Sequence, residues 1–228
     1  MEFVGIEKFS LVDYDGKVSC VLFAEKCNFR CPFCHNAALV CGDAQTALPF
    51  QDILTYLKKR RNAIDAVVIS GGEPTLMPDL IERISKIKAM GFLIKLDTNG
   101  SHPEIIKELI DLNLVDYIAM DIKNSSAKYS STIGTSLDLS KIKESITLLI
   151  TSSIDYEFRT TLVNEFHDSF SIQMMAKEIA GAKKIFLQKF VDRGTCIQDN
   201  LHEVNIKTAQ EFVEILKPSV NQVFLRGY

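Results

Sequence analysis

Residues 66–74 read AVVISGGEP, a continuous apolar run that ends in a glycine-rich polar segment. A strand covered on both faces reads as such a run, which is typical of parallel sheets in α/β proteins. Further apolar or β-branched runs have the character of strands, at 18–23, 93–97, 117–121, 156–162, 184–188 and 222–225. The pattern predicts a mainly parallel sheet in which 66–70 is a buried strand.

Segments with helical spacing of apolar residues separate these strands. They cover 53–61, 79–90, 103–112, 139–150, 171–180 and 208–216. Strand and helix recur about every 25 to 35 residues, the length expected of repeated βαβ units. We therefore expect six βα units in one α/β domain over residues 1–228, with residues 1–16 as a lead-in strand or hairpin.

Composition excludes several classes of protein. The chain has 228 residues, 46% hydrophobic and 24% charged, as in ordinary globular proteins. Lys plus Arg is 26 and Asp plus Glu is 29, which gives a net charge of −3. The chain therefore lacks the excess of positive charge that would predict nucleic-acid binding. Neither a membrane span nor a signal peptide is visible, and the six cysteines do not have the pattern of a secreted disulfide framework. We expect a cytoplasmic protein.

Three cysteines cluster directly after the first parallel strand, with the spacing Cys27-x3-Cys31-x2-Cys34. One short loop can bring three thiols to one metal centre. A structural zinc site needs four protein ligands, here only with His35 as the fourth. An iron-sulfur cluster held by three thiolates instead keeps one iron open to a further ligand. The other cysteines show no pairing and are expected to be bystanders: Cys20, Cys41 and Cys196.

The following strands also end in polar segments, and in parallel α/β folds such loops line the ligand site. Gly71 and Gly72 allow close approach of the backbone, and Glu73 can accept a hydrogen bond from an ammonium group. Aspartates end the next two strands, within Asp97-Thr98-Asn99-Gly100 and Asp121-Ile122-Lys123. Buried carboxylates need partners, and Lys123 is the obvious one.

Arg159 lies inside the fifth parallel strand. A charge in an apolar strand indicates a buried partner, for which the two aspartates Asp97 and Asp121 are candidates. The histidines outside the cysteine loop share no spacing, and we expect them to be solvated: His102, His167 and His202.

The cysteine loop, with Phe33 before its third cysteine, and the Gly-Gly-Glu-Pro segment at 71–74 together resemble the radical S-adenosylmethionine (SAM) superfamily. The resemblance implies a partial (βα)6 TIM-like barrel, open on one side. It also implies a [4Fe-4S] cluster on Cys27, Cys31 and Cys34 that reductively cleaves SAM to a 5′-deoxyadenosyl radical. The cofactor contacts that it implies are Phe33, Gly71, Gly72, Glu73, Asp97, Thr98, Asn99, Asp121, Lys123 and Arg159, with a monovalent cation near Asp97 and Asp121.

Cys34-His35-Asn36 is similar to the activating enzymes of glycyl radical proteins. Leu187-Gln188-x-Phe190 and the terminal LRGY are most similar to the activating proteins of anaerobic ribonucleoside-triphosphate reductase. This likeness implies a glycyl radical enzyme as protein substrate and an external electron donor such as flavodoxin or ferredoxin. Two alternatives stay open. One is a small-molecule radical enzyme such as 7-carboxy-7-deazaguanine synthase, and the other is a non-catalytic iron-sulfur or zinc module.

Overall fold

The computed structural model describes residues 1–41 and 46–228, without the side chain of Cys41. The expectation that Cys41 is a bystander therefore falls outside the described residues. Contacts within the chain divide it into two compact units, the first of residues 1–28 and 38–118 and the second of residues 29–37 and 119–228. Each unit is built from two stretches of sequence. The single domain over residues 1–228 stays a prediction.

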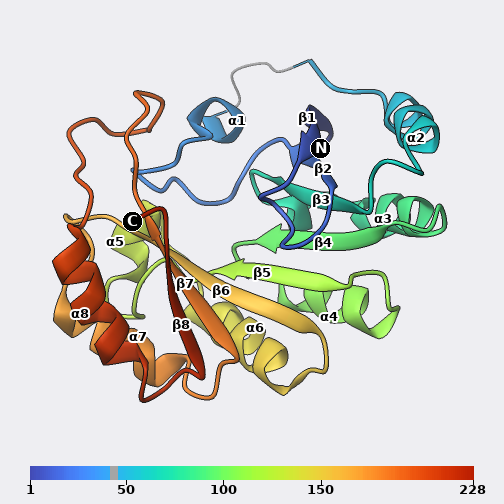
Figure 1. Cartoon of the computed structure of the whole chain (residues 1–228). Coiled ribbons are helices and arrows are strands. Elements are labelled where there is room, and N and C mark those ends of the chain that lie inside the picture. Colours follow the sequence, from blue (N-terminus) through green and yellow to red (C-terminus); the bar gives the residue numbers. More distant parts are fainter. Residues whose placement is uncertain (42–45) are drawn as a thin grey trace. The chain divides into compact units, whose positions relative to one another are not determined.

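The first unit begins with an antiparallel hairpin and continues with parallel strands (Figure 1). Its elements are β1 (Phe3–Ser10), β2 (Ser19–Ala24), α2 (Phe50–Lys59), β3 (Ala66–Gly71), the 3-10 turn η1 (Pro74–Leu76), α3 (Leu80–Lys88), β4 (Leu93–Thr98) and α4 (Pro103–Asp111). The helix α1 (Ala37–Cys41) and the strand β5 (Tyr117–Asp121) each cross a boundary between the units.

The core of the first unit follows from its apolar pattern. β3 is the middle strand of β2, β3 and β4, and residues 66–69 are fully buried. Leu80, Ile84 and Ile87 form the buried face of α3, at the helical spacing that the sequence predicts. The strand ends that lead to the polar loops are therefore fixed by a buried sheet.

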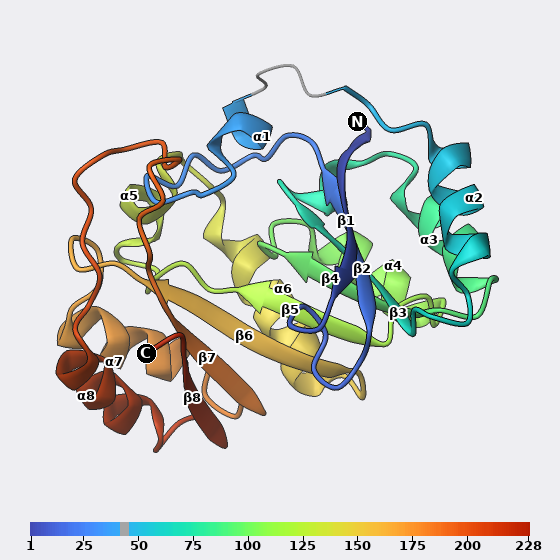
Figure 2. The same cartoon turned by 45° about the horizontal axis from the view of Figure 1, so that its top comes forward.

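The second unit contains α5 (Tyr129–Ile133), α6 (Leu139–Thr151), β6 (Asp155–Leu162), α7 (Ser169–Glu178), β7 (Lys184–Lys189), α8 (Ile206–Leu216) and β8 (Gln222–Arg226). β6, β7 and β8 are parallel, and Arg159, Phe186 and Phe224 are partners in successive pairs. α7 and α8 lie side by side (Figure 2). Asp168 caps α7 by accepting a hydrogen bond from the Ser171 N–H at 2.7 Å.

The structure confirms the predicted sequence of elements. All seven predicted strands are present, and β1 pairs with β2 as the lead-in hairpin. Each strand from β2 to β7 is followed by helix before the next strand, which gives the six predicted βα units. The predictions missed α1, η1 and α5, which have five, three and five residues and are too short to show a helical period. No helix in the described ranges is long and apolar enough to cross a bilayer.

Candidate functional site

Two glycines bring the end of β3 against the chain that leaves β2. A Cβ atom at Gly72 would lie 1.8 Å from the Lys26 carbonyl oxygen, and one at Gly71, whose φ is +111°, would lie 2.5 Å from backbone atoms of Ala24. The Glu73 N–H donates to that Lys26 carbonyl at 2.8 Å. No larger residue fits, so the glycines fix the chain immediately before Cys27.

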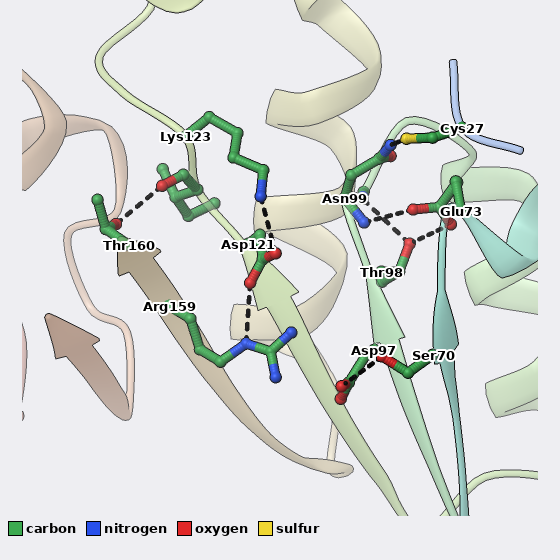
Figure 3. Close-up of polar contacts among 12 residues, drawn as sticks. Cys27, Ser70, Glu73, Asp97, Thr98, Asn99, Asp121, Lys123, Arg159 and Thr160 are labelled. Carbon is green, nitrogen blue, oxygen red and sulfur yellow. Dashed lines mark hydrogen bonds and ion pairs between the residues drawn. The ribbon is translucent and has the colours of Figure 1, made fainter. Parts of the chain in front are cut away.

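Glu73 joins the loops after β3 and β4 (Figure 3). Its carboxylate is fully buried and accepts hydrogen bonds from the Thr75 hydroxyl at 2.5 Å, the Thr98 hydroxyl at 2.8 Å and the Asn99 N–H at 2.6 Å. Burial raises the pKa of Glu73, while these donors oppose the shift. The geometry therefore makes Glu73 a positioning residue for Thr98 and Asn99.

Asn99 links the hydrogen bonds of Glu73 to Cys27, the first cysteine of the motif. Its amide nitrogen lies 3.8 Å from the Cys27 sulfur and 2.8 Å from the Asn28 amide oxygen. Asn28 in turn donates to the Ser101 hydroxyl at 2.9 Å. An N–H donor at a cysteine sulfur favours the thiolate, the form that binds metal. The predicted site did not include Asn28 and Ser101, because no sequence pattern marks a single loop side chain as part of a hydrogen-bond network.

Asp97 is held from two sides within the first unit. The Ser70 hydroxyl donates to its carboxylate at 3.0 Å, and the Lys95 ammonium lies 3.3 Å from its other oxygen. The sequence offered Lys123 as the partner of this aspartate, but an ion pair with Lys95 is found. Lys95 precedes Asp97 by two residues on the same strand, so the two side chains share one face of β4.

In the second unit, Asp121 at the end of β5 accepts from two cations (Figure 3). The Lys123 ammonium lies at 2.9 Å and the Arg159 Nε at 2.8 Å. Burial alone would raise the pKa of Asp121, but the charges of Arg159 and Lys123 outweigh it and lower the pKa to about 2. The prediction that Lys123 pairs with Asp121 is confirmed, and the structural partner considered for Arg159 is present.

A buried histidine fixes the loop that carries Lys123. The His167 Nε2 lies 3.0 Å from the Lys123 carbonyl oxygen, and its Nδ1 accepts from the Val163 N–H at 3.1 Å. Asn124 adds a hydrogen bond to the Phe166 carbonyl at 2.9 Å. The expectation that His167 is solvated is wrong, since the residue is only 4% exposed. Burial lowers its pKa, which keeps the ring neutral.

The other two motif cysteines lie on a short turn of the second unit, in which the Cys34 N–H donates to the Cys31 carbonyl at 3.0 Å. Burial raises the pKa of the Cys31 thiol to about 11, although the positive charge of Lys123 acts in the opposite direction. Phe33 is buried and packs on Phe166 with ring centroids 5.8 Å apart. Phe33 thereby anchors the turn that holds both thiols.

The loop after β7 contacts the same turn from another direction. The Val191 carbonyl oxygen lies 2.6 Å from the His35 Nε2, and the Gln198 N–H donates to the Pro32 carbonyl at 3.0 Å. Cys196 lies on this loop, and burial together with the charges of Asp192 and Cys34 raises the pKa of its thiol. Sequence patterns do not predict that this segment lies near the motif, because the contact joins positions about 160 residues apart.

The predicted site residues thus form two groups, one in each unit. The first unit brings together Cys27, Gly71, Gly72, Glu73, Thr98 and Asn99, with Asp97 beside Ser70. The second contains Cys31, Phe33, Cys34, Asp121, Lys123 and Arg159. Within the described residues, no three His, Cys, Asp or Glu side chains already form a metal-binding group. The donor chemistry nonetheless suits an iron-sulfur cluster, since Asn99 faces one thiol and the charge of Lys123 acts on another.

Residues 21–170 match the family model of the radical SAM superfamily, and the chain belongs to this superfamily. Membership confirms the predicted cofactors, a [4Fe-4S] cluster and SAM; the individual ligands and contacts, and the monovalent cation, stay predictions. The fold class is confirmed as well. A solved domain of the pyruvate-formate lyase-activating enzyme from Bacteroides vulgatus matches with a TM-score of 0.58 at 19% identity, over 71% of this chain and 99% of that domain.

Two curated relatives bear on the kind of radical enzyme. A protein of Methanocaldococcus jannaschii, provisionally named a glycyl-radical enzyme activating enzyme, is 36% identical over 191 residues, 82% of this chain and 78% of its own length. The 7-carboxy-7-deazaguanine synthase of Neisseria meningitidis serogroup B is 33% identical over 108 residues, 47% of this chain and 45% of its own length. The first likeness extends over nearly the whole chain, and the second over about half.

Proposed function

We propose that this protein is a radical SAM activase that generates a glycyl radical on a partner enzyme. The relative that is similar over 82% of the chain bears this activity in its name. The further sequence likeness leads us to propose anaerobic ribonucleoside-triphosphate reductase as the partner. The reaction needs an external one-electron donor such as flavodoxin or ferredoxin, and we place it in the reducing cytoplasm, where free thiols persist.

The observation that carries the proposal is the environment of two of the motif thiols. Cys27 faces the amide nitrogen of Asn99 at 3.8 Å, and the charge of Lys123 favours the thiolate of Cys31. The Asn99 donor favours the deprotonated form of Cys27, and the charge of Lys123 opposes the rise in pKa that burial causes at Cys31. Cys27, Cys31 and Cys34 would hold the cluster, and one iron would remain for SAM.

The groups at the ends of the strands would bind the rest of the cofactor. When bound, the cluster and SAM supply one-electron cleavage of a carbon-sulfur bond and a radical that removes a hydrogen atom. Arg159 and Lys123 would face the SAM carboxylate, because cations suit that group. Glu73 would act indirectly, by holding the loop of Thr98 and Asn99 in place.

An electron paramagnetic resonance experiment tests the proposed activity. Anaerobically reconstituted protein, a reductant, SAM and the anaerobic reductase are mixed, and the spectrum is recorded. We expect the doublet of a glycyl radical, absent when SAM is omitted or when the Cys31→Ala variant is used. Cleavage of SAM without a doublet, on this reductase or on any other glycyl radical enzyme offered, would contradict the activase assignment and favour a small-molecule substrate.

A further inference from the structure

Tyr129, the first residue of α5, has a buried hydroxyl group whose proton no described protein group accepts. The residue is 2% exposed, and no group in the described part of the chain accepts a hydrogen bond from its Oη. A buried hydroxyl whose proton finds no acceptor is destabilising, and such groups are uncommon in native proteins. The mechanism proposed above does not use this side chain.

Both ends of α5 pack against the segment that leads into Cys31. The Tyr129 ring meets the Phe29 ring edge-on, with centroids 6.4 Å apart and an interplanar angle of 80°. At the other end of the helix, the Arg30 N–H donates to the Ile133 carbonyl at 2.8 Å. The following Gly134 is so close that a Cβ there would lie 2.3 Å from the Arg30 carbonyl oxygen. α5 is therefore fixed to the cysteine loop at two points.

The charges around the phenol indicate where its free proton points. Burial raises the pKa of Tyr129, the Lys123 cation and backbone N–H oppose the shift, and the charges of Cys31 and Asp121 add to it. The Tyr129 ring also contacts Phe29, two residues before Cys31, so the phenol lies next to the segment that carries a predicted cluster ligand. The neighbouring Lys123 offers donors and no side-chain acceptor, so the group that Tyr129 lacks is an acceptor for its own O–H.

We propose that the Tyr129 hydroxyl donates a hydrogen bond to a sulfur atom of the iron-sulfur cluster, either the Cys31 thiolate or an adjoining sulfide. The inference deepens the proposed function and depends on cluster binding. Hydrogen bonds to the sulfurs are among the factors that set the reduction potential of a cluster. Reduction adds negative charge, so this donor stabilises the reduced form and raises the potential. Tyr129 would then tune the electron transfer that starts the reaction.

The test compares Tyr129→Phe with Tyr156→Phe. Both rings are fully buried in the second unit, but the Tyr156 hydroxyl already accepts from the Lys183 N–H at 3.0 Å. Each reconstituted variant is titrated anaerobically, and the reduced cluster is followed by electron paramagnetic resonance. This readout requires neither SAM nor a protein substrate. A loss of the donor that changes the one-electron equilibrium tenfold moves the potential by about 59 mV.

We expect a lower potential in Tyr129→Phe and an unchanged one in Tyr156→Phe, with wild-type iron content in both. An unchanged potential in Tyr129→Phe with an intact cluster would overturn the role of Tyr129 and leave the proposed function standing. Equal shifts in the two variants would also overturn it, because they would indicate a general effect of lost hydroxyl groups. Failure of the wild-type protein to bind any cluster would instead overturn the proposed function, and this inference with it.

Discussion

The two units each carry a carboxylate near the end of a parallel strand, yet in opposite electrostatic settings. Glu73 in the first unit is surrounded by hydroxyl and backbone donors, and burial raises its pKa. Asp121 in the second unit lies between Arg159 and Lys123, which lower its pKa to about 2. Neutral donors fix a loop, whereas paired charges also provide cations for an anionic ligand. The first unit is thus suited to positioning, and the second to binding the charged part of a cofactor.

The largest expected effect concerns the close backbone contact at Gly72 in the first unit. In Gly72→Ala the new Cβ would lie 1.8 Å from the Lys26 carbonyl oxygen, a backbone atom that cannot move aside. We expect a loss of at least about 4 kcal/mol in the free energy of unfolding, measured with urea, or no folded protein. Gly16→Ala is the control, because Gly16 has a φ of +71° but a Cβ there would meet nothing within 4 Å. Its cost should be about 1 kcal/mol, and equal losses would contradict the close approach.

The next largest effect concerns the ion pairs of Asp121 in the second unit. Asp121→Asn leaves Arg159 and Lys123 without their half-buried anion, and we expect a loss of about 3 kcal/mol in urea unfolding. Asp168→Asn is the matched variant, because Asp168 also has a pKa lowered to about 2 but pairs with Lys128 near the surface. It should cost about 1 kcal/mol.

Wild type and Asp121→Asn should also differ in how their stability depends on pH. A carboxyl group whose folded pKa is lowered stabilises the fold above its ordinary pKa of 3.8 and loses that contribution as the pH falls toward about 2. The stability difference between wild type and Asp121→Asn should therefore shrink between pH 4 and pH 2. A difference that stays constant over this range would show that the charge of Asp121 is not what stabilises the fold.

A smaller effect is expected at His167, which holds the loop of Lys123 in the second unit. His167→Phe removes the partners of the Lys123 carbonyl and the Val163 N–H, both buried, and we expect a loss of about 2 kcal/mol. His202→Gln should change stability by less than about 0.5 kcal/mol, because His202 is exposed. Thermal unfolding measures both. Similar values for the two variants would mean that His167 does not hold the Lys123 loop.

The fold was accessible from the sequence because its signals are local. Runs such as 66–69 and the helical face of α3 combine into a period that identifies βα units. The cysteine spacing likewise identified the superfamily. The sequence did not indicate α5, whose five residues YSSTI have no amphipathic pattern. It also failed for His167 and for the partner of Asp97, since such contacts depend on which side chains the finished fold brings together.

Cleavage of SAM in four proteins tests the central claim most directly, namely that Cys27, Cys31 and Cys34 hold the catalytic cluster while Cys196 does not. The measurement is the yield of 5′-deoxyadenosine from reduced, reconstituted wild type, Cys31→Ala, Cys34→Ala and Cys196→Ala, with iron and sulfide content determined in parallel. We predict that the two motif variants lose both the cluster and the product, and that Cys196→Ala retains both. Undiminished 5′-deoxyadenosine in Cys31→Ala, or its loss only in Cys196→Ala, would contradict this account.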